Sequence, residues 1–363
     1  MGREATAPRS GRLAHGGTDA NFGVELKPRA RDQPGRVTVL SEHRRIAVGI
    51  VVGAFCLVGL APGQTPRPSV RVERLLDAPI ITPELDPSIG VNIQGPSLIR
   101  VPDWVQAPLG RYYLYFAEDS YFLTDPPEVP PGEFERIRAA REASGRAALS
   151  HDLLTEITAP HIASPDVHVD DTNRRIIMYF HGLEGVSRQV TRAALSRDGI
   201  RFEARPEVLG RTYMRAFQHD GHTYAMSMPG QFYRSRDGLS AFEEGPSLFN
   251  SDMRHAGLLK RGSTLFVFWT QVGHAPERIL LSTIDISGDW SSWTETDPVE
   301  VLRPERDWEG AAAPLEPSVR STAYGHVNQL RDPAIYEEDG RTFLLYAVAG
   351  ESGIAIAEVH FDR

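Results

Sequence analysis

The sequence is poor in cysteine, in lysine and in helical periodicity. Its only cysteine is Cys56, so the chain cannot form an intrachain disulfide, and it has no CxxC pair for a metal. Lysine is almost absent, so nearly all of the basic charge is arginine. The net charge of -9 argues against nucleic acid or an anionic membrane surface as the main partner.

Several motifs of common enzyme classes are also missing. No GxSxG, P-loop or GxGxxG sequence occurs in a strand-turn-helix context, and no basic groove is interleaved with aromatic residues. These absences argue against serine hydrolases, nucleotide-dependent enzymes and nucleic-acid-binding proteins. With 41% hydrophobic and 24% charged residues, the composition is that of an ordinary globular protein.

The N-terminal part contains an uncharged apolar run from Ile46 to Ala61 that follows Arg44-Arg45 and precedes a proline-rich stretch. The run is short for a membrane span of about 20 residues and suits the apolar region of a signal peptide or an uncleaved anchor. We therefore expect residues 1–45 to be disordered or absent from the mature protein, 46–63 to be a signal peptide or anchor and 64–71 a linker. The protein is then secreted, periplasmic or anchored facing outward, and its true translation start stays open.

From residue 72 onward, one β-hairpin design is repeated five times: a short apolar strand, a tight turn, and a second strand of β-branched and aromatic residues. The hairpins begin with Gly95-Pro96-Ser97-Leu98-Ile99, Ser164-Pro165-Asp166-Val167, Met214-Arg215-Ala216-Phe217, Arg254-His255-Ala256-Gly257 and Arg331-Asp332-Pro333-Ala334-Ile335. Repeats of roughly 40 to 50 residues with about four strands each are typical of propeller blades.

The repeats predict an all-β fold, a five-bladed propeller over residues 72–363. A β-sandwich would also have short strands, but it would not repeat one hairpin. The charged, alanine-rich segment from Gly132 to Leu149 is expected to be a helical insertion in or after the first blade. A second repeat, Ser-Arg-Asp-Gly at 196–199 and 235–238, fits the turn after a third strand.

In a propeller, the first strand of every blade lines the central channel, and its start lies at the channel mouth. The residues expected there are Gln94, Asp166, Arg215, Arg254, His255, Arg331 and Asp332. Asp166 and His255 are predicted to occupy the same slot of their blades. Carboxylates beside a proton-transfer group suit the cleavage of a glycosidic bond, in which one group protonates the leaving oxygen and another activates water.

Other residues near the predicted mouth have simpler interpretations. His161, His168 and His181 could ligate a metal with an aspartate, but their spacing favours hydrogen bonding in the channel. Asp332 could merely cap a turn beside its proline. Glu244 resembles a catalytic acid, yet it is expected on an outer strand and is set aside.

These hairpin starts, together with the Ser-Arg-Asp-Gly repeats, resemble the five-bladed propeller glycoside hydrolases around family 43, including the α-neoagarooligosaccharide hydrolases. The resemblance covers about Val91 to Val359. It implies a base aspartate in the first blade, an orienting aspartate in the second and an acid in a later blade. Asp166 matches the second of these. Gly95 stands where the first-blade aspartate is expected, and His255 stands where an acid would open a later blade.

Taken together, the sequence predicts a glycoside hydrolase that acts on an oligosaccharide or polysaccharide, or else a propeller that only binds glycans. The predicted catalytic residues are Asp166 as the orienting or base carboxylate, His255 as the general acid and Asp332 as the second carboxylate. The predicted substrate-binding residues are Gln94, His168, His181, Arg215, Arg254, Gln271 and Arg331. The predicted export weakens a third reading, a phosphorylase. No cofactor is needed for this chemistry, and an ion in the channel stays open.

Overall fold

The computed structural model describes residues 68–117, 125–144, 150 and 152–362. The predicted disordered segment, the apolar run with Cys56 and residues 64–67 of the predicted linker lie outside these residues. The described part of the chain is a β-propeller with few helices, so the expected all-β fold class is confirmed. Within that part, no helix is long and apolar enough to cross a membrane.

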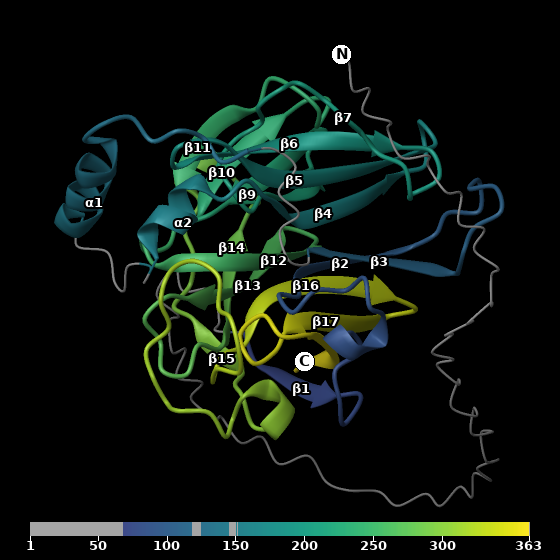
Figure 1. Ribbon diagram of the computed structural model, residues 1–363. Coiled ribbons are helices and arrows are strands. Elements are labelled where there is room, and N and C mark those ends of the chain that lie inside the picture. The colour runs from purple at the N-terminus through teal and green to yellow at the C-terminus, as the bar shows by residue number, and fades with distance from the viewer. Residues whose placement is uncertain (1–67, 118–124, 145–149, 151, 363) are drawn as a thin grey trace, which may run out of the picture. The chain divides into compact units, whose positions relative to one another are not determined.

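Four sheets have four antiparallel strands each, and their innermost strands are β4, β8, β12 and β16 (Figure 1). Three sheets use consecutive strands: β4 (Ile162–Asp170), β5 (Arg175–Gly185), β6 (Arg188–Ser196) and β7 (Glu203–Ala204); β8 (Arg215–His219), β9 (His222–Ser227), β10 (Gln231–Ser235) and β11 (Glu243–Ser247); β12 (Met253–Arg261), β13 (Thr264–Gln271), β14 (Ile279–Asp285) and β15 (Val299–Leu302). The fourth contains β16 (Arg331–Glu338), β17 (Arg341–Ala347) and β18 (Ile354–Phe361), and the N-terminal strand β1 (Val70–Arg74) completes it beside β18.

The fifth predicted hairpin forms a sheet of only two strands, β2 (Gln94–Arg100) and β3 (Tyr112–Ala117). Its inner strand β2 packs between β4 and β16. The described residues thus contain four complete blades instead of the five that were predicted. Between β3 and β4 lie two helices, α1 (Glu133–Ala143) and α2 (Leu153–Thr158), and α1 begins one residue after the start expected for the helical segment. Three short 3-10 helices cover Pro83–Leu85, Trp290–Ser292 and Asp307–Glu309.

The hairpins form because strand-forming residues are separated by turns that need positive φ. Asp220 and Gly221 have φ values of 46° and 71°, and Asp339 and Gly340 have 50° and 76°. Two consecutive positive φ values define a type I′ turn, whose twist matches that of the flanking strands. Asp-Gly pairs adopt this turn at little cost, so these hairpins follow directly from the local sequence.

The Ser-Arg-Asp-Gly repeat links neighbouring sheets. In the second copy, the Asp237 carboxylate accepts hydrogen bonds from the backbone N–H groups of Leu239 (2.8 Å) and Ser240 (2.9 Å) and so fixes the turn. The carbonyl of Gly238 then accepts from the Tyr179 hydroxyl of the preceding sheet at 2.8 Å. In the first copy, the Gly199 carbonyl accepts from Tyr115 of β3 at 2.9 Å. The repeat is therefore structural.

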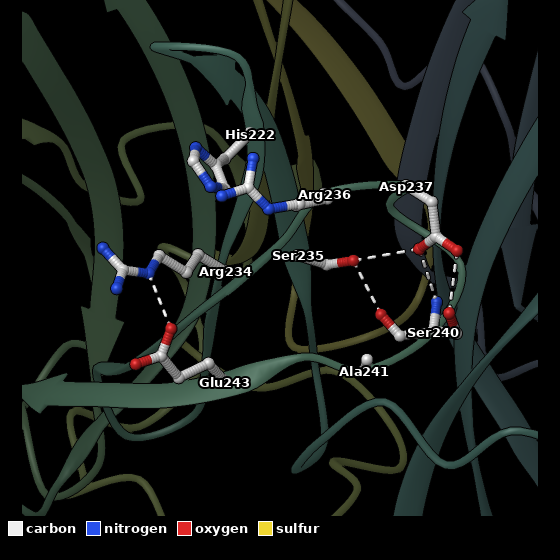
Figure 2. Close-up of a pocket in the computed structure, with 8 residues that line it drawn as sticks. All are labelled: His222, Arg234, Ser235, Arg236, Asp237, Ser240, Ala241 and Glu243. Carbon is white, nitrogen blue, oxygen red and sulfur yellow. Dashed lines mark hydrogen bonds and ion pairs between the residues drawn. The ribbon is translucent and has the colours of Figure 1, made fainter.

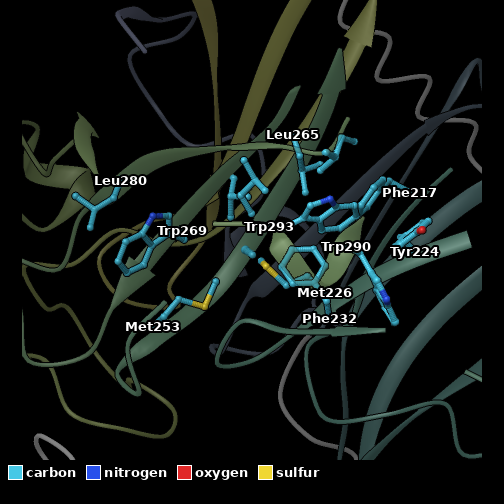
Figure 3. Close-up of a cluster of buried hydrophobic side chains, with 14 residues drawn as sticks. Phe217, Tyr224, Met226, Phe232, Met253, Leu265, Trp269, Leu280, Trp290 and Trp293 are labelled. Atoms are coloured by element: carbon cyan, nitrogen blue, oxygen red, sulfur yellow. The ribbon is translucent and has the colours of Figure 1, made fainter. Parts of the chain in front are cut away.

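Apolar side chains fill the space between adjacent sheets. Figure 3 shows the cluster between the sheets of β8–β11 and β12–β15, where Phe232, Trp269 and Trp293 are all buried. The Phe232 and Trp293 rings meet edge to face, with 5.5 Å between their centroids. Such packing fixes the sheets face to face and so holds the starts of their inner strands in place.

Candidate active site

A residue with positive φ marks the start of every inner strand. These residues are Gly95 (62°), Ser164 (53°), Tyr213 (59°), His255 (47°) and Asp332 (51°). In β2, β4, β12 and β16 the strand pairing shifts register at this point, as in a β-bulge. A bulge interrupts the alternation of side chains and aims one of them away from the sheet. Tyr213 lies two residues before β8, which pairs with β9 without a register shift, so it is grouped with the other four residues by its positive φ. We call these five positions the bulge slots.

The bulge slots correct the prediction that Asp166 and His255 are equivalent. The residue of β4 that corresponds to His255 is Ser164, and Asp166 lies two positions further along the strand. They also explain the glycine in the first hairpin. A Cβ atom on Gly95 would lie 2.9 Å from the Cα of Ser164, so no side chain fits where the family resemblance implies an aspartate.

Three slot residues from three different sheets meet in one cluster. The Tyr213 hydroxyl donates to Asp332 Oδ1 over 2.5 Å, and His255 Nδ1 lies 3.8 Å from the same oxygen. The rings of Tyr213 and His255 lie 5.0 Å apart, centroid to centroid. The Asp332 side chain is 1% exposed and that of His255 is 11% exposed, so the imidazole is the member of this group that solvent reaches. Tyr213 was not predicted, although aligning the slots would have identified it.

Arg215 connects this cluster to β4. Its guanidinium lies 4.2 Å from the centre of the Tyr213 ring and donates to the carbonyls of Ser164 (2.9 Å) and Ala256 (3.0 Å). Within the described part of the chain, Arg215 Nη2, Asp332 Oδ2 and His181 Nδ1 are buried without a hydrogen-bond partner. Natural proteins rarely leave buried polar atoms unpaired, and here three such atoms surround one tyrosine.

Two other predicted arginines form buried ion pairs. Arg254 donates from Nε to Glu277 over 2.9 Å and also from Nη2, and Arg331 donates from Nη1 to Glu351 over 2.6 Å. Arg254 is 4% exposed and Arg331 is fully buried. Because their donors are held by carboxylates inside the protein, these arginines have little left to offer a ligand. Their buried ion pairs give them a structural role, and sugar binding by either arginine stays a prediction.

The buried charges set the protonation of the cluster. Burial, with the nearby Glu351 carboxylate, raises the pKa of Asp332 to about 7, although Tyr213, Arg331 and Arg215 oppose the shift. Burial, with Arg254 and the two other arginines, holds the pKa of His255 well below its usual range. Near neutral pH the His255 imidazole is therefore uncharged. A neutral imidazole accepts a proton and does not donate one, so this charge state differs from the protonated form that a general acid requires.

Asp332 makes a testable contribution to pH-dependent stability. Its pKa is raised from the ordinary 3.8 to about 7, so the folded protein holds a proton that the unfolded chain releases between these values. This contribution is fully present below about pH 4 and is lost as the pH rises through about 7. The wild-type unfolding free energy should therefore fall more steeply over this window than that of Asp332→Asn, as measured by urea unfolding at a series of pH values. An Asp339→Asn control in the exposed turn should keep the wild-type slope; equal slopes in Asp332→Asn and wild type would contradict the assignment.

Asp166 and His168 form a second pair on β4. Asp166 Oδ2 lies 2.7 Å from His168 Nε2 and accepts the backbone N–H of Ala216 at 2.8 Å, which binds it to the next sheet. Burial alone would raise the pKa of Asp166, but His168 and Arg215 hold it below its usual range. Burial alone would lower the pKa of His168, but Asp166 raises it. The side chains are 15% and 39% exposed, respectively.

The remaining predicted residues make separate contacts. His181 is buried with its ring centroid 6.3 Å from that of Tyr213, and burial, His161 and Arg215 lower its pKa to about 3. Gln94 meets Ser164 Oγ only at 3.5 Å, and Gln271 accepts from Asn250 at 2.9 Å. Glu244 lies on the outer strand β11, as expected. No group of three His, Cys, Asp or Glu side chains in the described residues could hold a metal ion.

A hollow of about 400 Å³ lies over β9 to β11, away from the inner strand β8 of its sheet (Figure 2). Its polar side chains bind one another. Arg234 pairs with Glu243 at 2.8 Å, and Ser235 Oγ donates to Asp237 at 3.0 Å or to the Ser240 carbonyl at 2.6 Å. Because these groups are already satisfied, the hollow offers less chemistry than the slot cluster.

Comparison with known proteins places the chain in a family. No model of a protein family matches it. The uncharacterized protein R118 of Acanthamoeba polyphaga mimivirus is 34% identical over 305 residues, which cover 74% of this chain and 84% of the viral protein. The chain belongs to the family of this viral protein. This relationship carries no activity with it, because the relative is itself uncharacterized.

Solved structures are similar in fold. A member of the GH130 family, which is described as mannoside phosphorylases that include glycoside hydrolases acting on β-1,2 mannosidic linkages in Candida mannan, has a TM-score of 0.50 at 10% identity. The match covers 82% of this chain and 95% of that one. The α-L-arabinanase of Cellvibrio cellulosa matches with a TM-score of 0.44 at 12% identity, over 75% and 93% of the chains. The GH130 match confirms the predicted resemblance to glycoside hydrolase propellers, and identities this low show the fold alone.

Proposed function

We propose that this protein cleaves a glycosidic bond in an oligosaccharide or polysaccharide at the start of its inner strands. The observation that carries the proposal is the convergence of Tyr213, His255 and Asp332 from three sheets, with neutral His255 as the exposed member. The fold shared with glycoside hydrolase propellers supports a glycan as the ligand.

The roles follow from protonation and exposure. In hydrolysis, a water oxygen bonds to the anomeric carbon while the bond from that carbon to the leaving oxygen breaks. His255 accepts the proton of the attacking water, and Asp332, whose Oδ1 lies 3.8 Å from His255 Nδ1, helps to hold the ring in place. The leaving oxygen takes a proton from a separate donor.

A panel of neutral, uronic and sulfated glycans tests this proposal. The full chain should release reducing ends from at least one class, and the same preparation with His255→Asn should not. If no glycan is cleaved at any pH between 4 and 9, the hydrolase proposal is wrong.

One observation favours the alternative of a propeller that binds glycans without cleaving them. Asp332 is 1% exposed, and Asp166 is held by His168 and by Ala216, so neither carboxylate stands open to solvent. In that case, the same panel shows saturable binding to one glycan and no release of reducing ends.

We also infer that the sheet of β2 and β3 is a reduced fifth blade. Strand β2 packs between β4 and β16 and has a bulge slot at Gly95. The bond from Tyr115 to Gly199 repeats the bond from Tyr179 to Gly238, which gives β3 the place of a second blade strand. In the sequence, the helices between β3 and β4 occupy the position of the outer strands of that blade, whereas in space α2 contacts β5.

Export is a further part of the proposal. It rests on the apolar run from Ile46 to Ala61 and on its basic and proline-rich flanks. Expressed with its full N-terminus in a secreting host, the protein should reach the periplasm, the medium or the outer face of the membrane. Retention in the cytoplasm would contradict this, and it would leave the proposed chemistry untouched.

A further inference from the structure

The proposed reaction needs a proton donor, and the neighbourhood of Arg215 contains one other partly exposed histidine with a carboxylate partner. His168 lies on β4, two residues after Asp166, and its side chain is 39% exposed. The Arg215 guanidinium donates to the carbonyls of Pro165 (3.2 Å) and Ala256 (3.0 Å), which are the chain neighbours of Asp166 and His255. Arg215 thus bridges the two strands that contain the histidines, although these strands belong to different sheets.

Asp166 holds His168 in position. Its Oδ2 atom takes the His168 contact at 2.7 Å and the Ala216 N–H at 2.8 Å, so the carboxylate bridges β4 and β8. Its side chain is 15% exposed, less than half the exposure of the imidazole that it holds. His168 is therefore the more accessible member of the pair.

The His168 ring is also fixed in orientation. Nε2 is bound to Asp166, and the Tyr179 ring of β5 packs against the imidazole edge to face, with 5.8 Å between centroids. This arrangement leaves Nδ1 as the ring nitrogen for a ligand. The charged and titratable groups that face the ring are Asp166 on its own strand, Tyr179 on β5 and Arg215 on β8.

We propose that His168 is the proton donor of the site and that Asp166 is its positioning residue. This inference rests on the proposed function; it gives His168, which the sequence predicts to bind substrate, the role of proton donor, and it keeps the orienting role for Asp166. His168 gives its Nδ1 proton to the leaving oxygen as the glycosidic bond breaks, and His255 takes one proton from water in the same turnover. The two histidines then exchange protons with solvent, so the balance of each cycle is one water added to one bond.

The opposite shifts of the two histidines support this division of roles. The Asp166 carboxylate raises the pKa of His168 against the effect of burial, whereas burial and three arginines lower that of His255. Paired titratable groups whose environments separate their pKa values commonly divide into a donor and an acceptor.

Titration of His168 by NMR tests the inference without any need for activity. In the full chain, its resonance, assigned by loss in His168→Gln, should titrate above the ordinary histidine range. In Asp166→Asn the midpoint should fall by about one pH unit or more, because an adjacent opposite charge shifts a pKa by about one to three units. Asp170→Asn is the matched control, because Asp170 lies two residues after His168 on β4. In this variant the His168 midpoint should move by less than half of the shift seen in Asp166→Asn. An unchanged midpoint in Asp166→Asn overturns the inference.

Activity provides the second measurement. With a cleaved glycan, His168→Gln should lower kcat at least about 10-fold, and Asp166→Asn should lower it less and move the alkaline limb of the pH profile to lower pH. A greater loss in Asp166→Asn than in His168→Gln overturns the inference. If no glycan is cleaved, the proposed function fails, while the titration still decides whether Asp166 holds His168 in its charged form.

Discussion

Replacing His255 by asparagine is expected to lower kcat/KM for a cleaved glycan at least about 100-fold, the usual contribution of a general base. The reason is geometric as well as chemical. His255 has a φ of 47° and is the exposed member of its cluster, with a pKa well below the ordinary range. Asparagine tolerates this left-handed conformation better than most residues, so the backbone should keep its course. Initial rates over a range of glycan concentrations measure the effect.

The control for this variant is His222→Asn. His222 is the first residue of β9, next to the Asp220-Gly221 turn, and takes no part in the slot cluster. Its replacement should leave kcat/KM within about 2-fold of wild type. A His255→Asn protein that keeps more than a tenth of the wild-type kcat/KM would exclude His255 as the base.

The pH profile of the wild type should reflect both histidines. The base is active when neutral, so activity should persist on the acid side down to pH values well below the ordinary histidine range. The donor is active when protonated, so activity should fall as the pH rises through the raised pKa of His168. A pH profile of activity with one alkaline limb, which disappears in His168→Gln, would agree with His168 as the donor.

Replacing Glu277 by glutamine is expected to lower the free energy of unfolding by about 3 to 5 kcal/mol, the usual effect of removing one partner from a buried ion pair. Glu277 is fully buried and binds Arg254 at 2.9 Å through Nε, and its other oxygen lies 3.7 Å from Arg331 Nε. The neutral amide would leave two buried guanidinium groups short of countercharge. Urea unfolding followed by circular dichroism measures the loss.

A matched surface pair shows what burial adds. Glu243 binds Arg234 Nε at 2.8 Å, a similar bond length, but the Glu243 side chain is 59% exposed (Figure 2). Exposed ion pairs contribute up to about 1 kcal/mol, so Glu243→Gln should have a correspondingly small effect. Similar losses in the two variants would mean that the buried pair has no special role.

The buried ion pair of Glu277 and Arg254 also affects the candidate site. Arg254 and Arg331 both lower the pKa of His255, and Glu277 partly neutralises the two arginines. Glu351, which binds Arg331, raises the pKa of Asp332. The ion pairs beneath the slots thus hold the inner strands together and also set the charge state of the residues above them. Arg254 and Arg331, which the sequence suggested as ligand contacts, thus influence the charge state of His255 from buried positions.

The sequence by itself determined the fold class, because strand patterns and turns are local. Positive φ at Asp220-Gly221 and Asp339-Gly340 specifies hairpins without reference to the rest of the chain. The repetition of these hairpins then predicts a propeller. The sequence also indicated His255 and Asp332, which the structure brings to 3.8 Å, as well as the outer position of Glu244.

Only the tertiary structure decided which side chains meet and in which charge state. The bulges place Ser164, and not Asp166, in the slot equivalent to that of His255, because a register shift breaks the alternation on which sequence reasoning depends. Three features of the site depend on tertiary contacts. They are the space for a side chain at position 95, the carboxylates that pair with Arg254 and Arg331, and the uncharged state of His255. A pKa is set by burial and by neighbouring charges, which no single stretch of sequence contains.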